Sequence, residues 1–438
     1  MATLTSPQVE NELKAAYRRR LLIIVLVALA LRMAVIPFDH IENLMDADHI
    51  HAWEQGNVAR ALVAGHGFGS PMVSTQPSAI MPPVYPMIVA VFFHFFGVHS
   101  AQSIYAIHVF DCLINSLACI PIFLMVRCSF GERPAWWAAW GWAFSPYGIY
   151  FSAAWAWSTH LLLLCLCWLL YLAQDMEGSS RLGLWAGFGL LAGFAGLTEP
   201  SVLVVVPFLL ILAAWRLARA GKRWLLPGVV ASLVLAATIS PWLIRDAMVF
   251  HRFIPMRDSM GLELWMGNNG SSIRFTSDDL HPLHNAAELA EYNAGELAYM
   301  DHKEQQAKTY IQGHSARFAW MCARRVVYLW TGYWSFNHSY LAMEPTDREN
   351  VPFATCLTLL GLMGLFVAWR ERPYEAVRYG GVLFLLPVMY YFAHPEPYHM
   401  RPLDPLLVIL GCQAILALRE RVSVRTVLAP ASTAIQEA

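Results

Sequence analysis

Charged side chains are scarce in this sequence. Asp, Glu, Lys and Arg make up only 14% of its 438 residues, and the formal net charge is −1. Such a chain has no overall field that would attract nucleic acid. The eight cysteines show neither the spacing of a disulfide framework nor a CxxC metal pair. No small-residue cleavage site stands out after the first apolar run, which we therefore expect to be retained as a helix.

Apolar residues are abundant instead, at 57% of the chain. Several apolar runs are long enough to cross a bilayer core of about 30 Å. We predict an all-α integral membrane protein with about ten transmembrane helices. The predicted spans are residues 20–38, 102–126, 135–153, 157–174, 182–197, 200–218, 224–243, 353–369, 378–393 and 402–418. Lys and Arg collect between spans on the side that holds both termini, so both termini are predicted to be cytoplasmic.

The prediction is one membrane domain over residues 1–438, with two long extracytoplasmic loops at 39–101 and 244–352 and a disordered tail at 426–438. The apolar run 82–97 is short and begins with two prolines, so we interpret it as a re-entrant or interfacial helix; an ordinary short span is the alternative. In the second loop, the spacing over 286–318 predicts one or two surface helices.

The first loop holds the densest group of acids and histidines. Residues 51–64 have the pattern of a short interfacial helix, ended by a glycine-rich turn at 65–67. This helix would hold Asp46 and Asp48 just above the bilayer surface. A carboxylate there can accept a proton from an alcohol or amine while the rest of the substrate stays in lipid. The alternative is an inert, solvated acidic loop.

His49 and His51 lie beside these two aspartates. Mixed oxygen and nitrogen ligands suit a divalent metal ion. The alternative is a pair of interfacial histidines that only cap or hydrogen-bond. A divalent metal therefore stays an open alternative, and no other cofactor is expected.

Two outer segments carry arginines suited to an anion. Arg245 follows Pro241, which is expected to end a span, and a guanidinium binds phosphate through paired hydrogen bonds. A snorkelling interfacial arginine is the alternative. Arg401 lies near His399 in the last outer loop and is a second candidate, although Asp404 can neutralise it as a plain ion pair.

Other polar residues lie at or within predicted spans. Glu199 stands between two spans, and Asp111 lies inside one. An ionisable group at such a place is a candidate functional residue by default, with capping or ion pairing as the alternative. The segment 267–270, Gly-Asn-Asn-Gly, is a turn whose amides can face a polar ligand or simply reverse the chain.

Taken in order, these stretches resemble the GT-C superfamily of polytopic glycosyltransferases, close to the bacterial protein O-mannosyltransferase-like (family 39) and aminoarabinose lipid A transferase-like groups. The resemblance covers nearly the whole chain and is most specific in PWLIRD, 241–246, and ELWMGNN, 263–269. It implies a GT-C fold in the bacterial inner (plasma) membrane. It also implies inverting transfer of a sugar from a polyprenyl-phosphate carrier to a lipid, glycan or protein acceptor on the extracytoplasmic face.

Residue roles follow from the same resemblance. An acid of the first loop is implied as the base, in the order Asp48, Asp46 and Glu54. The residues implied to bind the carrier phosphate are Arg245, Arg401, His399 and Arg60. A lipid-linked sugar flippase or transporter is the rival hypothesis, which calls for ionisable residues in mid-membrane and broken helices. A non-catalytic membrane scaffold is the second rival.

Overall fold

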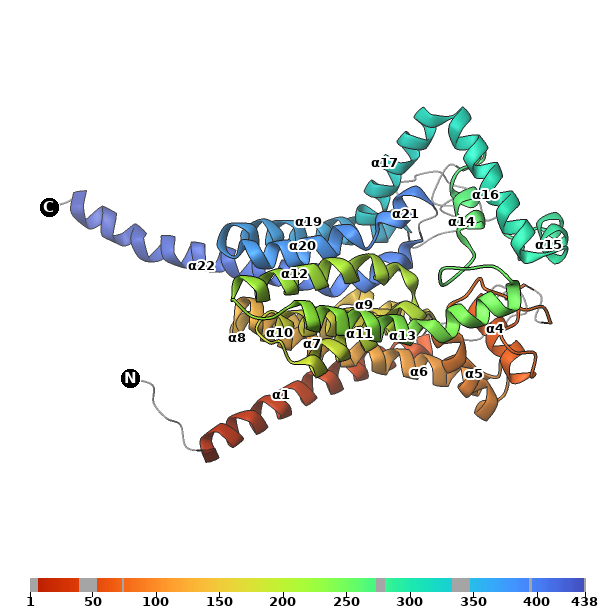
Figure 1. Ribbon diagram of the computed structural model, residues 1–438. Helices are drawn as coiled ribbons and strands as arrows, with labels where there is room; N and C mark the ends of the chain where they lie inside the picture. The colour runs from red at the N-terminus through yellow and green to blue at the C-terminus, as the bar shows by residue number, and fades with distance from the viewer. Residues whose placement is uncertain are drawn as a thin grey trace.

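The chain folds into a long helical bundle with a group of helices beyond one of its ends (Figure 1). The computed structural model describes residues 7–38, 53–72, 75–272, 280–332, 347–393 and 396–436, and this part of the chain contains no β-strand. The bundle helices are α1 (Pro7–Met33), η1 (Ile36–Phe38), α6 (Ala101–Leu117), α7 (Cys119–Phe130), α8 (Glu132–Ala143), α9 (Pro146–Ala154), α10 (Thr159–Met176), α11 (Leu182–Thr198), η2 (Pro200–Val204), α12 (Val205–Arg219), α13 (Leu225–Phe250), α19 (Asp347–Glu371), α20 (Pro373–Leu385), α21 (Val388–Phe392), η4 (Pro397–Leu403) and α22 (Asp404–Gln436). The outer helices are α4 (Glu54–Val63), α5 (Val84–Phe96), α14 (Met260–Gly267), α15 (Ala286–Asn293), α16 (Glu296–Gly313) and α17 (Ser315–Thr331).

Seven helical stretches among the described residues are long and apolar enough to cross a membrane. They are Ala15–Phe38, Ala101–Phe130, Thr159–Met176, Pro200–Arg219, Leu225–Phe250, Asn350–Glu371 and Tyr398–Glu420. All coincide with predicted spans, so the all-α, multi-pass membrane class is confirmed. Of the other three predicted spans, one is the shorter apolar helix α11, and two are each divided between a pair of helices, α8 with α9 and α20 with α21.

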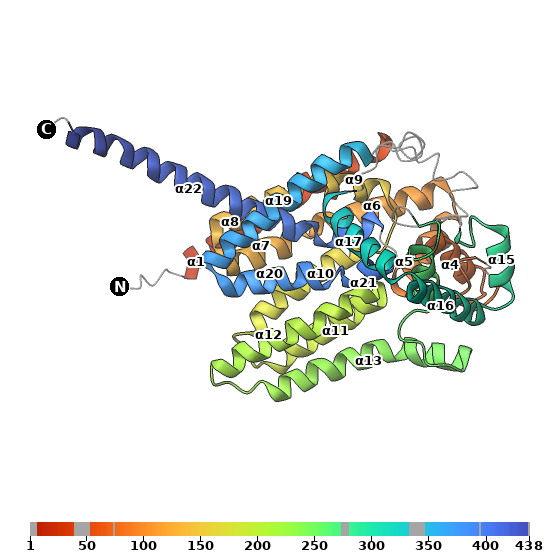
Figure 2. The ribbon, with the colours of Figure 1, turned by 90° about the horizontal axis from the view of Figure 1, so that it is seen from above.

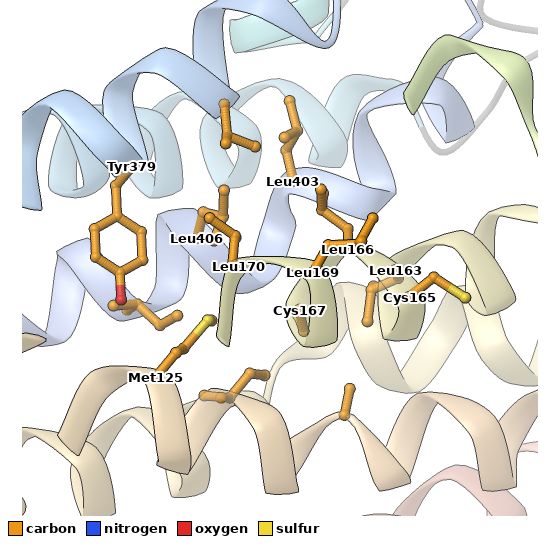
Figure 3. Close-up of a cluster of buried hydrophobic side chains, with 14 of the residues drawn as sticks. Met125, Leu163, Cys165, Leu166, Cys167, Leu169, Leu170, Tyr379, Leu403 and Leu406 are labelled. Carbon is orange, nitrogen blue, oxygen red and sulfur yellow. The ribbon is translucent and has the colours of Figure 1, made fainter. Parts of the chain in front are cut away.

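Helix α10 runs through the centre of the bundle. Its leucine- and cysteine-rich sequence buries side chains on every side, as expected for a helix surrounded by others. Figure 3 shows Leu166, Leu169 and Leu170 of α10 facing Met125 of α7 and Leu406 of α22. All eight cysteines of the chain are free, which agrees with the lack of a disulfide framework.

Helices α11 and α13 lie side by side (Figure 2). A Cβ atom on Gly189 of α11 would lie 2.2 Å from the carbonyl oxygen of Ala231 in α13, and one on Gly193 would lie 2.6 Å from Thr238. Glycines at this four-residue spacing let the two backbones approach closely, which is how helices associate in lipid.

Helix α13 corrects one expectation. Pro241 lies inside this helix and does not end it, because the helix continues to Phe250. A proline within a helix removes one hydrogen bond and favours a kink, but the turns on either side can persist. The adjoining Trp242 is buried, and its Nε1 donates to the carbonyl of Met256 at 2.9 Å, which ties the chain beyond the helix back onto it. Arg245 therefore lies on a helix rather than in a loop.

The second long loop folds into helices α14 to α17. They lie at the end of the bundle opposite to the start of α1 and the end of α22 (Figure 1). The sequence predicted one or two helices over 286–318, and the structure has α15, α16 and the start of α17 there. Helix α22 continues to Gln436, where a disordered tail was expected.

Helix α5 matches the expected short helix in the run 82–97. Its 13 residues span about 20 Å, well under the roughly 30 Å of a bilayer core. The Tyr85 hydroxyl of α5 donates to the buried carboxyl of Asp111 in α6 at 2.7 Å. Asp111 thus has a partner from the outer region, and whether α5 is re-entrant stays a prediction.

Candidate functional site

Of the three first-loop acids that are candidates for the base, the structure describes Glu54. Asp46, Asp48, His49 and His51 lie outside the described residues. Glu54 is the first residue of α4, and its Oε1 lies 3.3 Å from Nε2 of His281, with both side chains less than one-fifth exposed.

His281 comes from the second loop. Its Nδ1 accepts the backbone N–H of Leu283 at 3.2 Å, so in the neutral ring the proton is on Nε2 and faces Glu54. The second loop therefore holds the third-ranked catalytic candidate.

Helix α4 forms where the sequence predicted a helix and is followed by the expected turn, with positive φ at Gly65 and Gly67. Its buried side is more polar than an interfacial helix requires. Nε1 of Trp53 donates to the carbonyl of Ala156 at 3.1 Å, and Nε2 of Gln55 donates to Ser158 Oγ at 3.3 Å. Helix α4 is therefore fixed to the turn between α9 and α10 by polar contacts as well as by apolar packing.

The first and second loops are also joined at Glu296 of α16. This buried carboxylate accepts the backbone N–H of Ala79 at 2.8 Å and the hydroxyl of Tyr292 at 2.6 Å. Tyr292 in turn lies 2.6 Å from Ser70 Oγ. Burial raises the pKa of the Glu296 carboxyl above its ordinary value. Helices α15 and α16 thus cover the part of the first loop that follows α4.

A second set of charges surrounds Arg257, in the connection between α13 and α14. Its Nη2 lies 2.7 Å from Glu263 Oε1, its Nη1 lies 3.6 Å from Glu199 Oε1, and its Nε donates to Ser259 Oγ at 2.6 Å. We call Arg257, Glu199 and Glu263 the Arg257 cluster. It brings together the end of α11, the start of α14 and the chain between α13 and α14.

Glu54 belongs to the same neighbourhood. The carboxylates of Glu396, Glu263, Glu54 and Glu199 all lie close enough to the Tyr398 hydroxyl to interact with it electrostatically, and Glu54 interacts in the same way with Arg257. Among the described residues, these four carboxylates outnumber the one guanidinium of Arg257, so this group is acidic. Such a surface suits hydroxyl groups of a sugar or acceptor, whereas a phosphate needs cations from neighbouring elements.

Arg245 makes contacts within the protein. Its guanidinium donates to the carbonyls of Ser78 at 2.7 Å and Phe68 at 3.1 Å, and it pairs with Asp246 at 2.7 Å. It therefore ties the middle of the first loop, at Phe68 and Ser78, to α13. Arg60, another candidate for the carrier phosphate, lies in the last turn of α4.

Arg401 and His399 lie in η4. An Nη of Arg401 is 3.4 Å from Asp404, and its guanidinium lies over the ring of Tyr147 at 3.8 Å. Its buried Nε has no hydrogen-bond partner among the described residues. His399 stacks on Tyr390 at 4.1 Å, and its Nδ1 accepts the backbone N–H of Glu396. Arg401 therefore has a counter-ion in Asp404 and also an Nε donor that no described residue uses. Both alternatives from the sequence, a plain ion pair and binding of a phosphate, remain open.

The sequence did not identify several residues of the site. Arg257 and Glu263 lie in the same stretch as Arg245, but nothing in their spacing shows that they meet Glu199. Arg325 of α17 is fully buried and donates to Asn268 Oδ1 at 3.1 Å and to the carbonyl of Gly267. This arginine holds the Gly-Asn-Asn-Gly turn, and a charged residue in the apolar second half of α17 was its only signal.

A metal site was predicted only around His49 and His51. Within the part of the chain that the structure describes, no group of three His, Cys, Asp or Glu side chains is arranged to hold a metal ion. The predicted ligands lie outside that part, so the metal stays a prediction.

Comparison with known proteins adds to this geometry. Residues 80–244 match the family model described as dolichyl-phosphate-mannose-protein mannosyltransferase. No curated protein sequence matches the chain significantly.

The chain is similar in structure to the apo oligosaccharyltransferase of Archaeoglobus fulgidus, with a TM-score of 0.52 and 12% identity over 94% of this chain and 52% of that one. It is also similar to the oligosaccharyltransferase AglB of that organism in complex with an inhibitory peptide and a dolichol-phosphate, with a TM-score of 0.50 and 14% identity over 95% of this chain and 52% of that one. For ArnT from Cupriavidus metallidurans bound to undecaprenyl phosphate, the TM-score is 0.42 and the identity 15%, over 90% of this chain and 77% of that one.

The chain thus spans about half the length of the archaeal oligosaccharyltransferase. At this identity the likeness concerns the fold. The GT-C fold that the sequence resemblance implied is confirmed, because the chain shares the fold of this archaeal oligosaccharyltransferase.

Proposed function

We propose that this protein is a membrane glycosyltransferase that moves a sugar from a polyprenyl-phosphate carrier to an acceptor at the outer mouth of the bundle. The observation that carries the proposal is the match of residues 80–244 to a dolichyl-phosphate-mannose-protein mannosyltransferase model, in a chain with the GT-C fold. The archaeal oligosaccharyltransferase of this fold was solved with a dolichol-phosphate, which supports a lipid phosphate as the carrier.

The reaction is a single displacement. An acceptor hydroxyl or amine gives its proton to a first-loop carboxylate while its oxygen or nitrogen bonds to the anomeric carbon. The bond from that carbon to the phosphate oxygen breaks, its electron pair leaves with the polyprenyl phosphate, and the configuration inverts. Asp48 is the first candidate for the base, followed by Asp46 and Glu54, whose position beside the Arg257 cluster supports a role at this mouth.

The leaving phosphate needs positive charge as it departs. Arg401 is favoured among the described candidates, because its buried Nε is a donor that a phosphate oxygen can take. Arg245 already donates to two carbonyls and to Asp246, so a phosphate there would share the guanidinium with these contacts. His399 and Arg60 complete the candidate set.

The proposed location is the bacterial inner (plasma) membrane, with both termini cytoplasmic and the Arg257 cluster on the extracytoplasmic side. The acceptor is a lipid, a glycan or a protein. A divalent metal bound by His49 and His51 is the remaining alternative for assistance, and no step above depends on it.

A lipid-linked sugar flippase is a second candidate, and one observation favours it. Arg32, Asp111 and His160 are all buried inside the bundle, and ionisable residues at such depth are typical of transport pathways.

Sugar transfer in proteoliposomes tests the proposal. Wild type and Asp48→Asn are supplied with radiolabelled polyprenyl-phosphate sugars, with and without a chelator, and Asp39→Asn is the matched first-loop control. We expect carrier turnover in wild type and in the control, with a loss of about 100-fold or more in Asp48→Asn. A carrier that crosses the bilayer without losing its sugar would support the flippase. Loss of turnover with chelator would establish the metal.

A further inference from the structure

A chain of buried polar side chains links α1, α6 and α10. Nε of Arg32 donates to Asn115 Oδ1 at 3.0 Å, the Asn115 amide nitrogen lies 3.3 Å from Nδ1 of His160, and Nε2 of His160 lies 2.9 Å from the carbonyl oxygen of Trp155. A carbonyl can only accept, so Nε2 carries the proton and Nδ1 accepts from Asn115. All three bonds therefore run in one direction, from the Arg32 cation to the Trp155 carbonyl, and such chains strengthen cooperatively.

The cation at the head of this chain has an unusual environment. Arg32 is fully buried, and no carboxylate among the described residues forms an ion pair with it. Its Nη atoms donate instead to the carbonyls of Trp142 and Ala143, each at 3.2 Å, at the C-terminal end of α8. The negative end of the helix dipole offsets part of its charge. A buried intramembrane arginine remains costly, which indicates a role beyond packing.

The hydrogen-bonded chain runs from the helix that precedes the first loop to the turn that holds α4 within that loop. Arg32 lies in the last turn of α1, and the described chain before the first loop ends soon after it, at Phe38. At the other end, Trp155 begins the turn that receives α4. The Ala156 carbonyl of this turn accepts from Trp53, and its Ser158 hydroxyl accepts from Gln55.

We propose that Arg32, Asn115 and His160 are positioning residues that hold the turn 155–158, and through it α4 and Glu54, in the geometry required for sugar transfer. This inference rests on the proposed function. It also explains why mid-membrane polar residues occur in an enzyme, because they connect α1 to α4 through the interior. His108 lies on the same helix as Asn115 and is equally buried, yet neither of its ring nitrogens has a hydrogen-bond partner among the described residues.

Two substitutions at His160 each remove one of its two hydrogen bonds and keep the other. Asparagine can accept from Asn115 at the place of Nδ1 but does not reach Trp155, whereas glutamine reaches Trp155. We expect His160→Asn to lower kcat about ten- to a hundredfold, because small misplacements of reacting groups have effects of this size. KM for the carrier should stay within about twofold, and His160→Gln should retain more of kcat. His108→Asn is the matched control for the loss of a buried histidine, with kcat within about twofold of wild type.

A double-mutant cycle with Trp53→Phe tests the route of the effect. Phenylalanine keeps the ring and removes the N–H that binds Ala156. If both residues act through the same turn, the double variant should be no slower than the slower single variant within about twofold, since effects on one network do not add. Multiplied effects, or equal kcat in His160→Asn and His108→Asn, would overturn the inference.

Hydrogen exchange gives a measurement that does not depend on activity. Amides of α4 should exchange faster in His160→Asn than in wild type or His108→Asn, while those of α15 should not change. If wild type turns over no carrier, the proposed function fails, and the exchange of α4 still decides whether His160 positions it. Equal α4 exchange in both histidine variants would overturn the positioning role.

Discussion

Arg257 binds two carboxylates that come from separate parts of the chain, Glu199 and Glu263. A planar guanidinium can serve both at once, whereas a lysine ammonium is a point charge. We expect Arg257→Lys to lower kcat/KM for sugar transfer about tenfold and Arg257→Gln to lower it further. Partly buried acceptors left without their partner cost about 1–3 kcal/mol each. The measurement is transfer in proteoliposomes at several carrier concentrations.

Arg252 provides the control in the same connection. It pairs with Asp301, and both side chains are about half exposed. Because exposed pairs contribute about 0–1 kcal/mol, Arg252→Gln should stay within about twofold of wild type. Wild-type kcat/KM in Arg257→Gln would remove the Arg257 cluster from the proposed mechanism.

Arg245 and Arg257 show which site residues the sequence can identify and which it cannot. Sequence favoured Arg245 because it follows a proline at an expected span end. The helix continues past Pro241, and Nη1 and Nη2 of Arg245 donate to two carbonyls and to Asp246 within the protein. Neither spacing nor composition shows which arginine meets Glu199, because that contact depends on how α11 and α13 pack.

At the level of elements, the close approach of α11 and α13 gives a test of packing. We expect Gly189→Ala to lower the free energy of unfolding by about 1–3 kcal/mol, because its new methyl group meets a backbone carbonyl that cannot move aside. Gly187 lies in the same helix with nothing near its Cβ position. Gly187→Ala should be neutral or stabilising, since alanine is favoured over glycine in helices by about 1 kcal/mol. Thermal unfolding in detergent measures both, and an equal Tm for the two variants would contradict the packing.

Element positions were largely predictable because a bilayer demands long apolar helices. Breaks within them were not. The predicted span 135–153 is divided at Ser145, whose side chain accepts the N–H of Gly148 and caps α9, with Pro146 in its first turn. Ser145 followed by Pro146 is a typical start of a helix. In the sequence this pair lies inside a long apolar run, which favoured one continuous span.

At the level of the whole molecule, the start of α1 and the end of α22 lie at one end of the bundle, and the second-loop helices lie at the other (Figure 1). An even number of crossings produces this arrangement. The chain that connects α12 to α13 carries Lys222 and Arg223, and the last turn of α12 carries Arg216 and Arg219; these four are among the basic residues that define the predicted cytoplasmic side. The exposed Ala290 of α15 lies in the predicted extracytoplasmic loop.

Orientation decides whether the Arg257 cluster can face an extracytoplasmic acceptor. We expect Ala290→Cys to react with a membrane-impermeant maleimide on intact spheroplasts, and Lys222→Cys to react only after permeabilisation, each above the labelling of the unsubstituted protein. The physical reason is the cost of moving clustered Lys and Arg across the membrane during insertion. The reverse pattern would place the cluster in the cytoplasm, where extracytoplasmic transfer is impossible and the base, the carrier phosphate and the acceptor would all have to be sought on the other face.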